Sequence, residues 1–93
     1  MTEATLRLRL YVAGTAPQSG LALARLRDFC ERHHAGRYAL EVVDVLRQPR
    51  RALDDGILLT PTLVRLQPSP VRQLVGALGD PSALVSLIGE GTP

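Results

Sequence analysis

The sequence offers few residues that could carry out covalent chemistry. Cys30 is the only cysteine among the 93 residues, so an intramolecular disulfide is impossible. It lies among apolar residues at helical spacing, where a cysteine behaves as a small hydrophobic side chain. A reactive thiol gains from a helix N-terminus, here near residues 16–19, and no cysteine lies there. We therefore expect Cys30 to be structural.

Two other groups could suggest a metal site. His33 and His34 are adjacent, so on a helix they point about 100° apart, and no third histidine or second cysteine joins them. Asp54 and Asp55, with Asp44, suggest a divalent cation weakly, because a solvated helix end gives the same pattern. Ser-His-Asp and paired-carboxylate motifs are absent from the sequence. We predict no metal, no cofactor, no catalytic residue and hence no enzyme.

Length and composition favour one binding domain. The net charge is only +2, the 11 basic residues are all arginine and mostly scattered, and only three residues are aromatic. Few rings and no basic stripe argue against nucleic-acid binding. The chain has no apolar run of eighteen residues that would span a membrane. Its first residues lack the pattern of a signal peptide, so we expect a cytoplasmic protein.

The apolar pattern predicts alternating strands and helices in the first half. Residues 6–12 alternate apolar and polar side chains, as a half-buried strand does. An amphipathic helix is expected from Pro17 to about residue 34, begun by a capping box of Thr15 and Gln18. The nearly continuous apolar run at 38–45 predicts a central strand covered on both faces.

The second half predicts a short helix, a hairpin and a last helix. The short helix starts at Pro49, and strands are expected at 62–67 and 71–75 on either side of a proline-rich turn. Asp80 caps the last helix, with Pro81 at its first position. The order is βαβαββα, in which the helical crossovers make parallel strands and the hairpin makes the sheet mixed.

Pro61 is the most informative residue for the fold. It interrupts an apolar stretch, lacks an N–H, and fits the entry to a strand. A proline at this point of a β-α-β-α pattern is the arrangement of the thioredoxin-like fold, which usually works through a Cys-x-x-Cys pair. One cysteine leaves the scaffold without that chemistry, which indicates a binding protein. Pro61, Pro68 and Pro70 are the candidates for cis peptide bonds.

Four motifs resemble those of the KaiB family, which belongs to the cyanobacterial circadian clock and has relatives in other bacteria. The resemblance runs in register from about Leu6 to Asp80 without gaps. The motifs are Leu8-Arg9-Leu10-Tyr11-Val12-Ala13-Gly14 with Pro17 and Ser19, Val43-Asp44-Val45-Leu46 with Pro49, Ile57-Leu58 with Thr60-Pro61-Thr62-Leu63, and Pro70-Val71-Arg72 with Gly76, Leu78 and Asp80.

The resemblance implies two folds and a set of partners. One fold is a thioredoxin-like βαβαββα monomer, and the alternative is a ground-state βαββααβ homotetramer, with remodelling from about Arg50 onward. The implied partners are a KaiC-like hexameric ATPase and autokinase, a KaiA-like protein, and a competing sensor histidine kinase. The expected function is regulatory binding that modulates the ATPase or phosphorylation cycle of the ring.

The expected contacts combine the resemblance with the sequence pattern. Arg9 and Arg72 match basic residues of the family, and we add Tyr11, Val43 and Asp44 as contacts, with sheet-edge backbone available for pairing. At three further positions where the family has a basic residue, this chain has none. These positions hold Leu21, Glu41 and Gln73.

Two positions of the last helix bear on the choice of fold. Leu87 and Gly89 stand where the family has a glycine and an aspartate whose replacement biases that choice. Leucine in place of glycine removes a helix cost of roughly 0.5–1 kcal/mol. We therefore expect the thioredoxin-like form to dominate in the isolated protein. Two other functions stay open, a sensor-input module for a histidine kinase or response regulator, and a thiol-dependent enzyme that uses Cys30.

Overall fold

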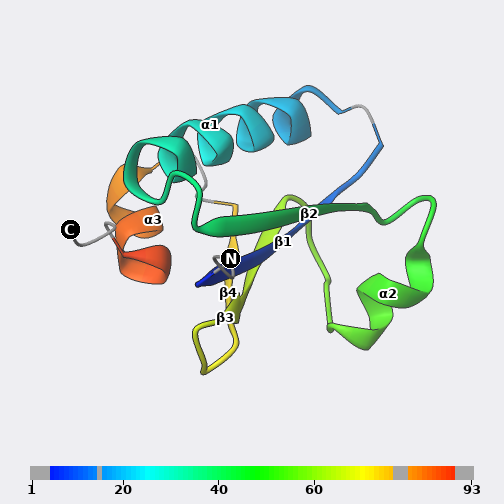
Figure 1. Ribbon diagram of the computed structural model, residues 1–93. Helices are drawn as coiled ribbons and strands as arrows, with labels where there is room; N and C mark the ends of the chain where they lie inside the picture. The colour runs from blue at the N-terminus through cyan, green and yellow to red at the C-terminus, as the bar shows by residue number, and fades with distance from the viewer. Residues whose placement is uncertain (1–4, 15, 77–79, 90–93) are drawn as a thin grey trace.

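The computed structural model describes residues 5–14, 16–76 and 80–89. Within them, one sheet lies between helices on both faces (Figure 1). The elements are β1 Leu6–Val12, α1 Pro17–His33, β2 Tyr38–Asp44, α2 Pro49–Asp54, β3 Thr62–Gln67, β4 Arg72–Val75 and α3 Pro81–Ile88. The predicted order βαβαββα and the thioredoxin-like fold are confirmed.

The sheet is mixed, with strand order β2-β1-β3-β4. Strand β2 runs parallel to β1, whereas β3 is antiparallel to both β1 and β4. The prediction of a central strand at 38–45 is wrong, because β2 lies at an edge and β1 and β3 are central. The apolar pattern of β2 has another cause. Tyr38 and Leu40 pack against the core beside α1, and Val43 is buried in the core beside α2. Helices on both faces require apolar residues even on an edge strand.

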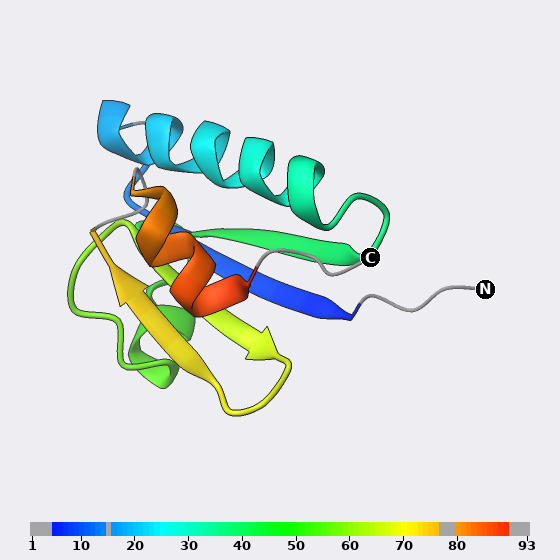
Figure 2. The ribbon, with the colours of Figure 1, turned by 90° about the vertical axis from the view of Figure 1, so that its left-hand side faces the viewer.

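The larger core lies between the sheet and α1 with α3. Alternate residues of β1, from Leu6 to Val12, face this core, and Leu26 and Cys30 of α1 are buried in it. Figure 2 shows α3 between α1 and the hairpin of β3 and β4. The residues of α3 that are buried against this core are Leu84, Leu87 and Ile88.

The smaller core lies on the other face, under α2. It contains Tyr11, Val43 and Val64 from the sheet, with Ala52 of α2 and Ile57 just after that helix. Because α2 has only six residues, it covers part of this face and contributes a single buried side chain. The rest of its attachment is polar, as described below.

The helix ends follow the predicted caps in part. Asp80 caps α3, since its carboxylate accepts a hydrogen bond of 2.9 Å from the N–H of Ser82. The capping box predicted for α1 lies outside the described residues, because it needs Thr15 and the side chain of Gln18. In the described part of the chain, no helix has the length and hydrophobicity needed to cross a membrane.

Candidate functional site

The segment around Pro61 has the geometry expected from the sequence. The Thr60–Pro61 bond is cis and leads directly into β3. The Pro61 carbonyl accepts a hydrogen bond of 3.1 Å from Gly76 at the end of β4, and the Thr62 hydroxyl donates to the Leu59 carbonyl at 2.6 Å. The bonds before Pro68 and Pro70 are cis as well. The peptide bonds before all three candidate prolines are thus cis in this structure.

The surroundings of the Cys30 thiol do not favour a reactive thiolate. Cys30 is fully buried in α1, and this burial, with the negative charge of Glu31, raises the pKa of its thiol to about 11. Within the described ranges, no group of three histidine, cysteine, aspartate or glutamate residues is placed to hold a metal ion.

Four charged residues form an arginine–carboxylate cluster between the sheet and α2: Arg9, Glu41, Arg51 and Asp55. Arg9 of β1 donates from Nε to Glu41 and from Nη1 to Asp55, both at 2.9 Å. Arg51 of α2 donates from both terminal nitrogens to the Glu41 carboxylate at 2.7 Å, a bidentate pair. The hydrogen bonds from Arg51 and Arg9 lower the pKa of Glu41 to about 2.

Tyr11 of β1 also forms a hydrogen bond to this cluster. Its hydroxyl donates to Asp55 at 2.5 Å and lies 3.1 Å from the Arg51 carbonyl. Partial burial disfavours the Asp55 anion, but hydrogen bonds from Tyr11 and Arg9 outweigh it and keep the pKa of Asp55 below its ordinary value. On the other side, the Gln73 side-chain amide donates to the Asp55 carbonyl at 2.8 Å. The end of α2 is thus held by β1, β2 and β4.

The five predicted contact residues have different surroundings in this fold. The side chains of Tyr11 and Val43 are both 0% exposed, so a partner cannot touch them here. Arg9 is engaged in the cluster. Asp44 accepts hydrogen bonds from the N–H groups of Gly14 and Leu46 at 3.0 and 2.9 Å, which lower the pKa of its carboxyl group.

Arg72 is the predicted contact that remains most accessible. It is exposed on the edge strand β4, and within the described residues its side chain forms no ion pair or hydrogen bond. Its cross-strand neighbour Arg65 is used inside the fold, where it donates to the carbonyls of Leu87 and Pro70 at 2.6 and 2.7 Å. The five predicted contact residues therefore lie in one sheet, but they do not form one exposed surface.

Sequence reasoning missed several exposed apolar side chains on the segments that lead from the carboxyl end of β2 to the start of β3 and at the end of β4. The start of β3 and the end of β4 lie beside the carboxyl end of β1, because Tyr11 pairs with Thr62 and Thr62 pairs with Val75. Leu58 is 92% exposed and Leu53 is 77% exposed. We call the group the apolar end surface: Leu46, Leu53, Leu58, Leu59 and Val75. The sequence alone did not show this, because the fold decides that Ile57, and not Leu58 or Leu59, enters the core.

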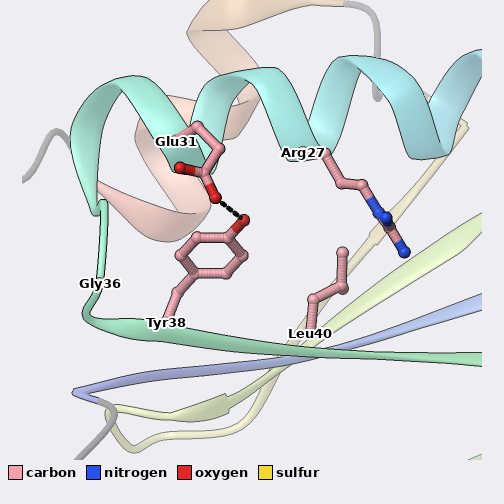
Figure 3. Close-up of a pocket in the computed structure, with 5 residues that line it drawn as sticks. All are labelled: Arg27, Glu31, Gly36, Tyr38 and Leu40. Carbon is pink, nitrogen blue, oxygen red and sulfur yellow. Dashed lines mark hydrogen bonds between the residues drawn. The ribbon is translucent and has the colours of Figure 1, made fainter.

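A separate pocket of about 420 Å³ opens beside the edge of β2 (Figure 3). Arg27 and Glu31 of α1, Gly36, and Tyr38 and Leu40 of β2 line it. The Tyr38 hydroxyl donates to Glu31 at 2.6 Å, and this bond raises the pKa of Tyr38 to about 12. The pocket residues offer neither a nucleophile nor a cluster of metal ligands, so the geometry favours the apolar end surface as the functional site.

Comparison with known proteins decides the family. A KaiB domain matches residues 9–88. The chain belongs to the KaiB family. It is 52% identical over 73 residues to the circadian clock oscillator protein KaiB of Prochlorococcus marinus strain MIT 9312, covering 78% of this chain and 70% of that protein. It is 49% identical over 73 residues to KaiB1 of Synechocystis sp. strain PCC 6803, with the same two coverages.

Solved structures agree with the fold of this KaiB-family chain. The N-terminal domain of Synechococcus elongatus SasA has a TM-score of 0.70 and 25% identity, covering 89% of this chain and 73% of that domain. A thioredoxin mutant from Halobacterium salinarum has a TM-score of 0.74 and 23% identity, covering 97% and 80%. The thioredoxin shows the fold alone. Family membership and the SasA domain together fit a regulator of a biological clock.

Proposed function

We propose that this chain is a non-catalytic regulatory protein that docks on a KaiC-type hexameric ATPase and changes the ATPase or phosphorylation cycle of that ring. It acts as a cytoplasmic monomer in the thioredoxin-like form. The observation that supports this most is the apolar end surface, which lies beside Pro61 in a chain whose one thiol is buried elsewhere. Family membership over residues 9–88 supplies the partner class.

The apolar end surface has the composition of a protein-binding site. We infer that these large exposed apolar side chains form one patch, which favours a protein partner, whereas scattered ones would need no explanation. Leu53 and Leu58 have little contact with the rest of the chain, so their burial against a partner gains apolar contact without breaking the fold. Arg47 and Arg50, both exposed, adjoin this surface in the sequence and suit carboxylates on the rim of a partner.

A binding experiment tests the proposal. The chain is mixed at tens of micromolar with the KaiC-type ATPase of the same genome and ATP, and complexes are detected by native mass spectrometry. The wild type should form a complex, and Leu58→Ser should weaken it at least tenfold, because an apolar contact with the partner is lost. Leu58 is 92% exposed, so the variant should still fold. Val85→Ser, at an exposed position of α3, is the matched control and should bind like the wild type. Failure of the wild type to bind would end the proposal.

A second candidate is a sensor-input module that binds a histidine kinase or a response regulator. The likeness to the SasA N-terminal domain favours it. The two functions share one fold, so a pull-down that recovers a histidine kinase but no ring ATPase would favour this candidate. A KaiA-like protein is a further partner that family membership suggests for the complex with the ring.

A thiol-dependent enzyme is the weakest alternative. The buried Cys30 thiol, with its raised pKa, is neither accessible nor ionised near neutral pH. The Cys30→Ala variant separates the classes, since partner binding should survive while a thiol activity would vanish.

A further inference from the structure

Helix α2 is attached to the sheet mainly by polar contacts. Ala52 is its one buried side chain, and Leu53 points away from the core with 77% exposure. The polar contacts of α2 are more extensive than this small apolar contact. They are the bidentate pair of Arg51 with Glu41 and the hydrogen bonds from Arg9 and Tyr11 to Asp55. A helix of six residues is not stable by itself, so these contacts decide where it lies.

The same contacts set the position of the apolar end surface. Asp55 is the C-cap of α2 and is followed by Gly56 with a φ of +67°. Ile57 then returns to the core and donates its N–H to the Ala52 carbonyl at 2.8 Å. Leu53 lies on α2, and Leu58 follows Ile57 directly. A shift of α2 would therefore displace both of these exposed leucines.

We propose that Glu41 and Asp55 are positioning residues for partner binding, which hold α2 and the segment 56–59 in place so that Leu53 and Leu58 form a preorganised surface. This inference rests on the proposed docking function. The two carboxylates do not touch the partner. They act through Arg9 and Arg51, and a surface fixed in advance costs less ordering on binding.

The side chains bonded within this cluster come from β1, β2 and α2, and Arg7 of β1 lines the same pocket as Arg9 and Glu41. Arg9 and Tyr11 come from β1, Glu41 from β2, and Arg51 with the neutral Gln48 from α2 and its start. The neutral Gln73 of β4 contacts only the Asp55 backbone. A positive charge at position 41 would therefore face two arginines, and their repulsion would push α2 off the sheet.

The first experiment needs no partner. Hydrogen exchange over residues 49–59 is measured in the wild type, Glu41→Gln and Glu41→Arg. We expect exchange there to rise roughly fivefold in Glu41→Gln and more in Glu41→Arg, with β1 and α1 unchanged. Asp28→Arg reverses a charge of an exposed pair with Arg32 on α1 and is the matched control, expected to leave 49–59 unaffected. Wild-type exchange in Glu41→Arg, or an equal rise in every strand, would overturn the proposal.

The second experiment measures binding to the KaiC-type ATPase against salt concentration. Glu41→Arg should bind at least tenfold more weakly at low salt and should recover as salt screens the repulsion among the three arginines. A misfolded variant would not recover, and Asp28→Arg should stay within twofold of the wild type. Wild-type affinity in Glu41→Arg, despite fast exchange at 49–59, would overturn the positioning role. If the wild type itself does not bind, the docking function fails, and the exchange data still decide whether the carboxylates hold α2.

Discussion

Arg9 shows what sequence reasoning can and cannot reach for a single residue. Its place on the polar face of the first strand follows from alternation with Leu8 and Leu10. Its partners do not, because Glu41 and Asp55 lie 32 and 46 residues away and meet it only through the strand order and the α2 crossover. Tyr11 and Val43 were expected as contacts and are buried for the same reason: α2 covers their face.

Glu41 predicts how the stability of the fold depends on pH. The pKa of its carboxyl group is about 2 in the folded chain and about 4.3 when unfolded, so its stabilising effect is present above pH 4.3 and disappears as the pH falls toward 2. Its side chain is 45% exposed, so solvent screening limits the effect to about 1 kcal/mol. Urea unfolding of Glu41→Gln should show a loss of that size at pH 7 and almost none near pH 2.

The comparison needs a control for removing any exposed carboxylate. Asp28→Asn breaks the exposed pair with Arg32 and should change the free energy of unfolding little at every pH. A loss in Glu41→Gln that is equally large at pH 2 would show that the Glu41 pairs are not the cause.

At the scale of elements, the sequence predicted which helices and strands form, and their order along the chain, better than which strands lie next to each other in the sheet. Each helix and strand falls within a few residues of its expected range, because capping residues, prolines and periodicity are local signals. The strand order is not local, so β2 was placed at the centre of the sheet although it forms an edge. The exposure of Leu58 and Leu59 likewise depends on how the segment before β3 packs, which is not a local signal.

Arg65 gives a prediction for α3. Its guanidinium holds the last turn of the helix through the Leu87 carbonyl and fixes the turn through the Pro70 carbonyl. Arg65→Met should lower the free energy of unfolding by about 1–3 kcal/mol, because two charge-assisted hydrogen bonds are lost. Urea denaturation measures this loss, and NMR shifts should change most over 84–88.

Its cross-strand neighbour is the matched control. Arg72→Met removes the same charge from an exposed position of β4 and should change the stability by less than about 0.5 kcal/mol. Equal losses in the two variants would mean that the bonds to α3 contribute nothing specific.

At the scale of the whole molecule, the chain keeps the thioredoxin-like scaffold, and its one cysteine is buried in α1. The fold could be read from Pro61 and the βαβαββα pattern, and the family from four short motifs in register. The proposed docking surface could not, because its residues come from α2 and from segments that flank three strands, and their exposure depends on how these pack. Leu87 is buried in α3 and Gly89 ends that helix with a φ of +82°, so both residues fit the helical form of this segment.

The central claim is that this thioredoxin-like monomer is the resident form of the free chain and the one that docks. The direct measurement is the mass of the isolated protein by size exclusion with light scattering, together with backbone NMR shifts over residues 81–88. We predict the mass of one chain and helical shifts throughout that segment. A mass near four chains, with shifts that show a strand at 83–88, would contradict the account.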